Sequence, residues 1–149
     1  MQAYIWIGLG GALGSMARHW CNGLAARLAG VDFPWGTLFI NILGSFIIGV
    51  ASATMGSEGR WPTSMTAQQF VMVGICGGYT TFSSFSLQTL DLMRGGAMDR
   101  AAINVAASVV LCIAAVAAGH ALGAHLNGGA REIKSYSCAT ALMRACIAR

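Results

Sequence analysis

The chain has 149 residues, of which 56% are hydrophobic and only 9% are charged. Soluble domains usually carry about 25% charged residues, so this composition excludes an ordinary soluble protein and indicates an integral membrane protein. The net charge of +4 does not indicate a nucleic-acid-binding protein, because the Lys and Arg residues are scattered or lie near the C-terminus. The five cysteines include no CxxC pair, so neither a disulfide framework nor a metal site is indicated. At about 20 apolar residues per span, the length allows one domain of about four transmembrane helices.

The first predicted span covers about residues 3–29 and is rich in small residues. Gly10 and Gly14 have the GxxxG spacing, which predicts close packing of this helix against another one. A dinucleotide-binding turn is excluded, because it requires a preceding strand and a glycine where Leu13 stands. Arg18 lies about two-thirds of the way along the span. Its side chain either extends to the membrane surface or stands in a water-filled vestibule that attracts anions, and the sequence alone leaves both open.

The second predicted span, about residues 35–55, carries a stripe of small and polar residues. Thr37, Asn41, Ser45 and Gly49 follow one another at i, i+4 spacing, so they share one face of the helix. Asn41 is the most informative of them, because a buried amide must find hydrogen-bonding partners. Two interpretations remain open: an interhelical hydrogen bond that holds the bundle together, or a donor that lines a pore.

The third predicted span, about residues 67–94, contains a segment that is unfavourable for an α-helix. Thr66 followed by Gln69 matches a capping box and predicts where the helix begins. Further on, Gly77 and Gly78 each cost about 1 kcal/mol relative to alanine, and the threonines and serines that follow add smaller penalties. An opened backbone is tolerated within a membrane only where protein or a polar cavity covers it. The stretch therefore predicts a helix broken near its middle, next to a buried functional interior.

Two phenylalanines and several hydroxyl side chains follow this predicted break. Phe82 and Phe85 are three residues apart and so lie on one face of the resumed helix, with serines and a threonine around them. The positive edges of aromatic rings, together with hydroxyl and amide donors, offer hydrogen-bonding partners without charge. Such a lining suits a small anion. The alternative, which stays open on this pattern alone, is that both rings pack in the core.

The fourth predicted span covers about residues 98–126 and again carries a mildly polar face, formed by Asn104, Ser108, Cys112 and Ala115. His120 and His125 are five residues apart, so they do not share a face as zinc ligands would, and we expect them at the membrane interface. The sequence thus predicts a four-helix transmembrane domain over residues 1–127. The basic remainder, residues 128–149, is predicted to be disordered or to lie on the membrane surface.

Charged residues are few within the spans, and the positive charges near the ends of the spans are divided between the two sides of the membrane. The spans contain no Asp or Glu before Asp91, which argues against a proton-coupled transporter, because such proteins usually depend on an intramembrane carboxylate. One side of the membrane would carry Arg60, Arg131, Lys134, Arg144 and Arg149, and the other Arg27, Arg94 and Arg100. Without the C-terminal residues this bias reverses, so the orientation in the membrane is weakly specified.

Three motifs in this order resemble the CrcB/Fluc fluoride channel family. The first is Gly11-Ala12-x-x-Ser15-x-x-Arg18, and the second is Gly36-Thr37-Leu38-x-x-Asn41-x-x-Gly44-Ser45. The third, Gly77-Gly78-x-Thr80-Thr81-Phe82-Ser83-Ser84-Phe85-Ser86, is highly specific, whereas the first alone would be weak. The resemblance covers all predicted spans, roughly residues 4–126.

This resemblance implies an antiparallel, dual-topology homodimer in the bacterial inner membrane, with two fluoride pores along the subunit interface. It implies that the protein exports fluoride passively and so relieves fluoride toxicity. Asn41 would donate a hydrogen bond to fluoride, and Phe82 and Phe85 would offer their ring edges. The remaining implied site residues are Ser83, Ser84 and Ser108 as a hydroxyl track, Arg18 in the vestibule, and the backbone carbonyls of Gly77 and Thr80 around a structural sodium ion on the dimer axis.

The sequence departs from the family pattern at three positions. Asn104 stands where many members have tyrosine, Cys112 where a serine often continues the polar track, and Gln88 where glutamate is frequent. Two functions of other classes stay open beside the channel. One is a small dual-topology multidrug exporter, which the missing intramembrane carboxylate disfavours. The other is a non-transporting assembly subunit in which the polar stripes only hold helices together.

Overall fold

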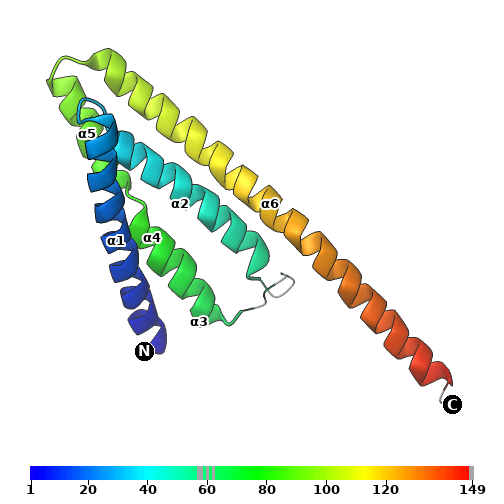
Figure 1. Cartoon of the computed structure of the whole chain (residues 1–149). Coiled ribbons are helices and arrows are strands. Elements are labelled where there is room, and N and C mark those ends of the chain that lie inside the picture. The colour runs from blue at the N-terminus through cyan, green and yellow to red at the C-terminus, as the bar shows by residue number, and fades with distance from the viewer. Residues whose placement is uncertain (57–58, 60, 62, 148–149) are drawn as a thin grey trace.

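The computed structural model describes residues 1–56, 59, 61 and 63–147, with side chains up to residue 128. Every regular element in this part of the chain is a helix. The long helices are α1 (Gln2–Ala29), α2 (Trp35–Thr54) and α6 (Met98–Ile147). Between α2 and α6 lie α3 (Met65–Gln68), the π-helix η1 (Gln69–Cys76), α4 (Gly77–Tyr79) and α5 (Phe82–Arg94), which together form one further crossing of the bundle (Figure 1).

These four crossings run alternately up and down. The ends of α1 and α5 and the starts of α2 and α6 lie at one end of the bundle, and the N-terminus lies at the other (Figure 1). Gly30, which follows α1, and Gly96, which precedes α6, have positive φ angles of 80° and 79°. Glycine adopts this backbone conformation without the steric cost that a side chain brings, which explains why glycine stands at these two turns.

Three of the four crossings are long and apolar enough to span a membrane. They are Trp35–Thr54, Met65–Arg94 and Met98–Gly128, with mean hydropathies of 1.8, 1.3 and 2.3. Helix α1, with 28 residues, has the length of a span but is not among the apolar candidates that the described residues contain. Its glycines and polar side chains, among them Arg18, His19 and Asn22, lower its hydropathy.

Close contacts between backbones hold α1 against η1 and α4. Gly10 and Gly14 are the buried residues of α1. A Cβ atom at Gly10 would lie 2.6 Å from the carbonyl oxygen of Phe70, and one at Gly14 would overlap the carbonyl oxygen of Ile75. The predicted packing through the GxxxG pair is therefore confirmed, and its partner is the third crossing of the bundle.

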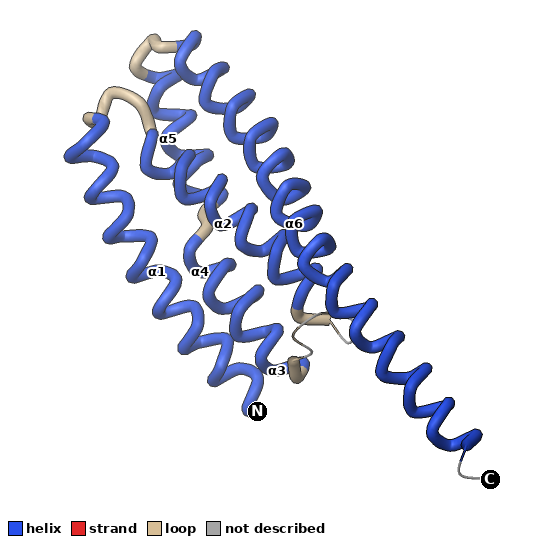
Figure 2. The backbone as a smooth tube through the Cα atoms, turned by 45° about the vertical axis from the view of Figure 1, so that its right-hand side comes forward, coloured by secondary structure: helices blue, strands red, loops and turns tan. Residues whose placement is uncertain are grey.

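Helices α2 and α6 pack along most of the length of α2 (Figure 2). Gly49 of α2 lies against the backbone of Val116, and Gly119 of α6 lies against the backbone of Phe46. Ile40 and Ala101, exposed to 1% and 0%, fill the core towards the other end of this contact. Small residues thus set the distance between these two helices as well.

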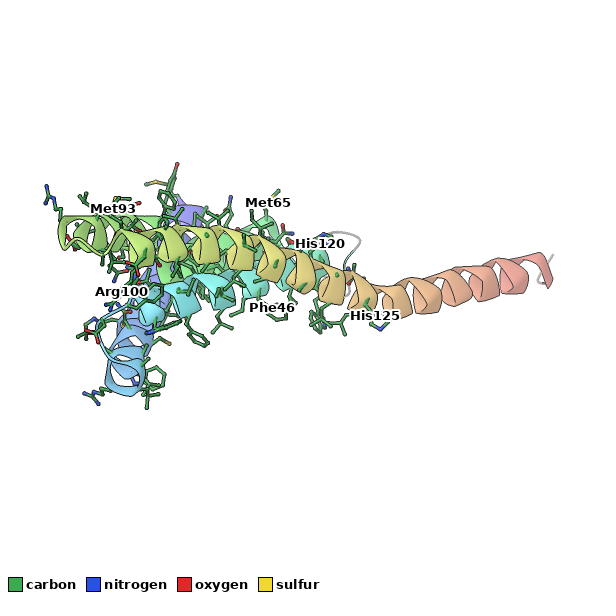
Figure 3. All side chains as sticks on the ribbon, turned by 90° about the horizontal axis from the view of Figure 1, so that it is seen from above. Phe46, Met65, Met93, Arg100, His120 and His125 are labelled. Carbon is green, nitrogen blue, oxygen red and sulfur yellow. The ribbon has the colours of Figure 1, made fainter. Side chains whose placement is uncertain are left out.

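Helix α6 continues past the bundle as a single helix (Figures 1 and 3). His120 and His125 are both exposed and lie towards the end where α6 leaves the bundle, while Met93 and Arg100 lie at the opposite end (Figure 3). The backbone stays helical to Ile147, beyond the predicted end of the fourth span at residue 126. The side chains of the predicted C-terminal tail lie outside the described residues, so its association with the membrane surface stays a prediction.

The third crossing begins two residues earlier than the capping box predicts. Ser64, not Thr66, caps the helix, and its hydroxyl accepts a hydrogen bond from the Ala67 N–H at 3.2 Å. Serine is at least as favourable an N-cap as threonine, so Ser64 can cap the helix although Ala67 does not complete a capping box. The side chain of Gln68 fixes the choice, because its amide donates to the carbonyl oxygens of Met55 at 2.9 Å and Thr63 at 3.3 Å.

Candidate functional site

The helical path of the third crossing is interrupted between Tyr79 and Phe82. Thr80 and Thr81 have extended backbones, with ψ angles of 159° and 112°. Figure 2 shows this segment as a short loop between α4 and α5. Helix α5 then begins at Phe82, capped by the hydroxyl of Thr81, which accepts a hydrogen bond from the Ser84 N–H at 3.2 Å. The interruption falls within the stretch in which glycine, threonine and serine disfavour a continuous helix.

Asn41 of α2 pairs with the interrupted backbone. Its Nδ2 donates to the carbonyl oxygen of Thr81 at 3.1 Å, and the Thr81 N–H donates to its Oδ1 at 2.8 Å. The asparagine Oδ1 thus replaces the helical acceptor of the Thr81 N–H, and its Nδ2 adds a donor to the Thr81 carbonyl. The interhelical hydrogen bond that the sequence allowed for Asn41 is therefore formed, while its role as a donor that lines a pore stays a prediction. The second N–H of Nδ2 remains for another partner.

This arrangement releases two backbone carbonyls from helical hydrogen bonding. In a continuous helix the Thr81 N–H would donate to the carbonyl of Gly77, but here it donates to Asn41. The Ser84 N–H would donate to the carbonyl of Thr80, but here it donates to the hydroxyl of Thr81. Both carbonyl oxygens can therefore accept a hydrogen bond from another group or bind a hard cation, which prefers oxygen ligands. These are the two carbonyls that the sequence resemblance implies around sodium.

Helix α2 fits closely against the break because it has no side chain at Gly44. A Cβ atom there would overlap the methyl group of Thr80 and would lie 3.3 Å from the ring of Tyr79. The Thr80 hydroxyl donates to the carbonyl oxygen of Cys76 at 3.0 Å, which turns its methyl group towards Gly44. Gly44 is therefore needed for close approach, not for an unusual backbone conformation.

A pocket of about 440 Å³ lies beside the break, between α2, the α4–α5 junction and α6. None of the residues that line it carries a charged side chain. Its lining combines an amide, hydroxyls, two aromatic rings, two thiols and aliphatic groups, contributed by Asn41, Ser45, Ile48, Cys76, Thr80, Thr81, Phe82, Phe85, Ser108, Val109, Cys112 and Ile113 together with Gly44 and Gly77. The pocket therefore offers neutral hydrogen-bond donors to a ligand, and its lining places no fixed charge next to that ligand.

Phe82 and Phe85 lie next to each other at this pocket. Their ring centroids are 5.3 Å apart, and the ring planes are inclined by 46°. The side chain of Phe82 is 78% exposed, whereas Phe85 is partly buried. The alternative that both rings pack in the core of this chain is therefore wrong for Phe82, because core packing would cover its ring.

The hydroxyl side chains predicted beside the pore fall into two groups. The Oγ of Ser108 lines the pocket, is buried, and has no hydrogen-bond partner among the described residues. Ser83 and Ser84 do not line the pocket; their Oγ atoms lie 3.2 and 3.1 Å from the Oγ1 of Thr81. Thr81 is thus the centre of a hydroxyl cluster at the start of α5.

Most of the predicted site residues meet at the pocket, and Arg18 does not. Gly77, Thr80, Asn41, both phenylalanines and Ser108 meet at the pocket. Arg18 lies elsewhere, half-buried on α1, and makes no hydrogen bond or ion pair with the part of the chain that the structure describes. The vestibule role of Arg18 stays a prediction.

A buried hydrogen-bond chain behind Phe85 was not predicted. Asn104 of α6 is only 1% exposed, and its Nδ2 donates to the Thr89 hydroxyl at 2.8 Å. That hydroxyl in turn donates to the carbonyl oxygen of Phe85 at 2.7 Å. The sequence signal was the position of Asn104 on the polar face of the fourth span, but nothing indicated Thr89 as its partner. The chain connects α6 to the turn of α5 that carries Phe85.

Comparisons with known proteins agree in their result. Residues 5–120 match the family model described as CrcB-like protein, Camphor Resistance (CrcB). A protein of Methylobacterium radiotolerans named fluoride-specific ion channel FluC is 57% identical over 87% of this chain and 90% of its own length. Proteins with the same name from Methylocella silvestris and Opitutus terrae are 53% and 52% identical over 83% and 85% of this chain, and over 95% and 96% of their own lengths.

Proposed function

The chain belongs to the CrcB family, and we propose that it is a fluoride-selective channel through which fluoride leaves the cytoplasm passively. The observation that carries the proposal is the pocket beside the Thr80–Thr81 break, which gathers neutral hydrogen-bond donors and aromatic rings. A small anion needs several such donors at once to replace its hydration shell, and it must also leave again, so a lining without fixed positive charge suits conduction better than tight binding. The names of the relatives add the identity of the anion.

Asn41, Phe82 and Phe85 are the residues that we assign to fluoride itself. One N–H of Asn41 is held by Thr81, which orients the amide and directs the second N–H to another partner. The edges of the two rings carry partial positive charge and so attract an anion in the plane of the ring. Asn41 therefore has two roles in this proposal: it stabilises the break and it donates to fluoride.

The hydroxyl groups would serve as further donors along the path. The unpaired Ser108 Oγ offers its hydrogen to the pocket, while Ser83 and Ser84 form the cluster around Thr81 at the start of α5. Arg18 would attract fluoride to a water-filled vestibule before it reaches these neutral donors. In this assignment the guanidinium raises the local anion concentration, and the neutral groups provide the selectivity.

We further propose that the channel is an antiparallel homodimer. Beside the pocket, the start of α5 exposes the residues Phe82 and Ser83. Next to hydrocarbon, an uncovered polar group and an interrupted backbone are unfavourable, so a protein surface is expected to cover them. A second copy in the opposite orientation would cover them. The weak charge bias of the sequence allows both orientations in the membrane. In this proposal the membrane is the inner membrane, and α1 crosses it as the fourth span.

A structural sodium ion on the axis of this dimer is part of the same proposal. The carbonyls of Gly77 and Thr80 fit such an ion, because their helical donors are engaged elsewhere. Two copies of the chain would provide four oxygen ligands. When bound, the ion would supply positive charge that holds the two interrupted helices together. Asn41 maintains the geometry from within each chain by fixing Thr81.

The proposed role can be tested in bacterial cells that lack their own fluoride export. Hydrogen fluoride enters cells, ionises in the neutral cytoplasm and is trapped there, so a passive fluoride pathway lowers cytoplasmic fluoride. We expect cells that express the chain to grow at a fluoride concentration that stops control cells, and to contain less fluoride. Expression of Phe82→Ile at the same membrane level should protect less than the unchanged chain. Equal growth inhibition with and without the chain would contradict the proposal.

A further inference from the structure

Two cysteine side chains line the pocket and have no part in the proposed function. Cys112 comes from α6 and is half-buried, while Cys76 comes from η1 and is only 3% exposed. The third cysteine whose side chain the structure describes, Cys21, lies outside the pocket, and its sulfur accepts a hydrogen bond from the Tyr79 hydroxyl at 3.4 Å. The pocket thus holds two thiols that differ in burial. Cys21, which is half-buried like Cys112, lies outside it and can serve as a control.

A polar group without a partner accompanies these thiols. The Oγ of Ser108 lies one helical turn before Cys112 on α6, lines the same pocket and forms no hydrogen bond within the described part of the chain. The residue is 8% exposed. A buried hydroxyl without a partner is unfavourable, and a small molecule that carries an oxygen or nitrogen acceptor into the pocket can satisfy it. This second feature indicates that the pocket can hold a guest next to Cys112.

We propose that the pocket is a modification site for small, uncharged, thiol-reactive electrophiles, with Cys112 as the nucleophile. The lining without charged side chains favours an uncharged reagent over an ionic one. A partly exposed thiol reacts faster than a fully buried one, so Cys112 is expected to react before Cys76. The effect on ion flux rests on the proposed function. The adduct obstructs the passage of fluoride, because it occupies the volume bounded by Asn41, Phe82 and Phe85.

The reaction can be written for methyl methanethiosulfonate. The thiol of Cys112 loses its proton to water, and the thiolate sulfur attacks the sulfenyl sulfur of the reagent. A new sulfur–sulfur bond forms to the methylthio group, while the sulfur–sulfur bond of the reagent breaks and methanesulfinate leaves with the electron pair. The cysteine becomes a mixed disulfide, and the reagent itself is the oxidant. An added dithiol reverses the modification by exchange.

The test uses the full chain reconstituted in liposomes. The protein is treated with methyl methanethiosulfonate, the adduct is located by mass spectrometry of peptides, and fluoride efflux is compared with that of the untreated sample. We expect the adduct on Cys112, a decrease in efflux by roughly tenfold because the obstructed pocket no longer replaces the hydration shell, and recovery with dithiothreitol. Cys21→Ser should remain as sensitive as the unchanged protein.

Two variants make the test specific. Cys112→Ser and Cys112→Ala, each compared with its own untreated efflux, should lose the sensitivity to the reagent. Inhibition that persists in both variants, labelling of other cysteines without Cys112, or an adduct on Cys112 with unchanged efflux would overturn the inference. Absence of fluoride efflux before any reagent is added would contradict the proposed function instead, and the mass measurement would still decide whether Cys112 is the reactive thiol.

Discussion

The third crossing of the bundle has two sides that are built differently. On the side of α1, glycines bring the backbones together: Gly10 and Gly14 of α1 lie against η1, and Gly78 of α4 lies against the backbone of Gly11. On the side of α2 and α6, the same crossing leaves a pocket of about 440 Å³ lined by an amide, hydroxyls, thiols and two rings. One side brings backbones into direct contact at these glycines, and the other leaves space for a ligand.

The difference shows how one interrupted helix is kept in place next to an open volume. A broken helix with solvent on both sides would lose its shape, because neither side would determine the position of Thr80 and Thr81. Here the α1 contact holds the segment from behind, and Asn41 holds it from the front through two hydrogen bonds. The comparison therefore predicts that substitutions on the α1 side affect folding, and that substitutions on the pocket side affect chiefly ion flux.

The largest effect on stability is expected from Gly14→Ala. The added Cβ would overlap the carbonyl oxygen of Ile75 and approach the backbone of Tyr79, so α1 must move away from the third crossing. Overpacking of this kind costs about 1–3 kcal/mol, and rigid backbone atoms place this site at the upper end. Thermal unfolding in detergent measures the change. Gly8→Ala is the matched control, because a Cβ at Gly8 meets nothing within 4 Å.

A large effect on both stability and flux is expected from Asn41→Asp. The carboxylate still accepts from the Thr81 N–H but cannot donate to the Thr81 carbonyl or to fluoride, and it adds negative charge to the pocket. Loss of a hydrogen bond to a charged group costs about 1.5–3 kcal/mol, which corresponds to a decrease in flux of roughly tenfold or more. Fluoride efflux and thermal unfolding are measured together. If flux is unchanged while stability falls, Asn41 only supports the break.

Phe82→Ile should separate flux from stability. The ring is 78% exposed, so its removal leaves no cavity in the core of the chain. The aliphatic side chain has no positively polarised edge, so we expect fluoride efflux to decrease by roughly tenfold with little change in unfolding temperature. Leu87→Ile, on the same helix and 59% exposed, is the control. Equal efflux from both variants would contradict the role of the ring.

The smallest effect on flux is expected from Asn104→Ala, because Asn104 acts through Thr89 and not on the ion. The variant removes the 2.8 Å hydrogen bond and leaves a cavity at a position that is 1% exposed. We expect a loss of about 1–3 kcal/mol in unfolding free energy, with a smaller decrease in flux than for Phe82→Ile. Thr89→Val should reproduce the effect. A flux loss larger than that of Phe82→Ile would place Asn104 in the ion path.

The parts that could be predicted from the sequence depend on local rules. The all-helical fold with four crossings follows from apolar length, and the contact of Gly10 and Gly14 follows from their spacing. The gathering of Asn41, Phe82, Phe85 and Ser108 at one pocket was implied only by the family resemblance. Their roles toward fluoride stay predictions.

The parts that could not be predicted depend on which side chains meet across the bundle. The pairing of Asn41 with Thr81, and of Asn104 with Thr89, requires knowledge of the register between helices, which spacing within one helix does not contain. The cap at Ser64 depends on where Gln68 finds its acceptors. The π-helix η1 also escaped prediction, because no residue pattern distinguishes it from an α-helix of the same composition.

The most direct test of the account is ion efflux from liposomes that contain the purified protein. Vesicles loaded with fluoride are followed with a fluoride electrode, and chloride-loaded vesicles serve as the control. The account predicts rapid fluoride release without chloride release, because hydrogen-bond donors interact more strongly with the charge-dense fluoride ion than with chloride. If neither ion moves from vesicles that contain folded protein, or if both move equally, the pocket beside the break is not a fluoride pathway.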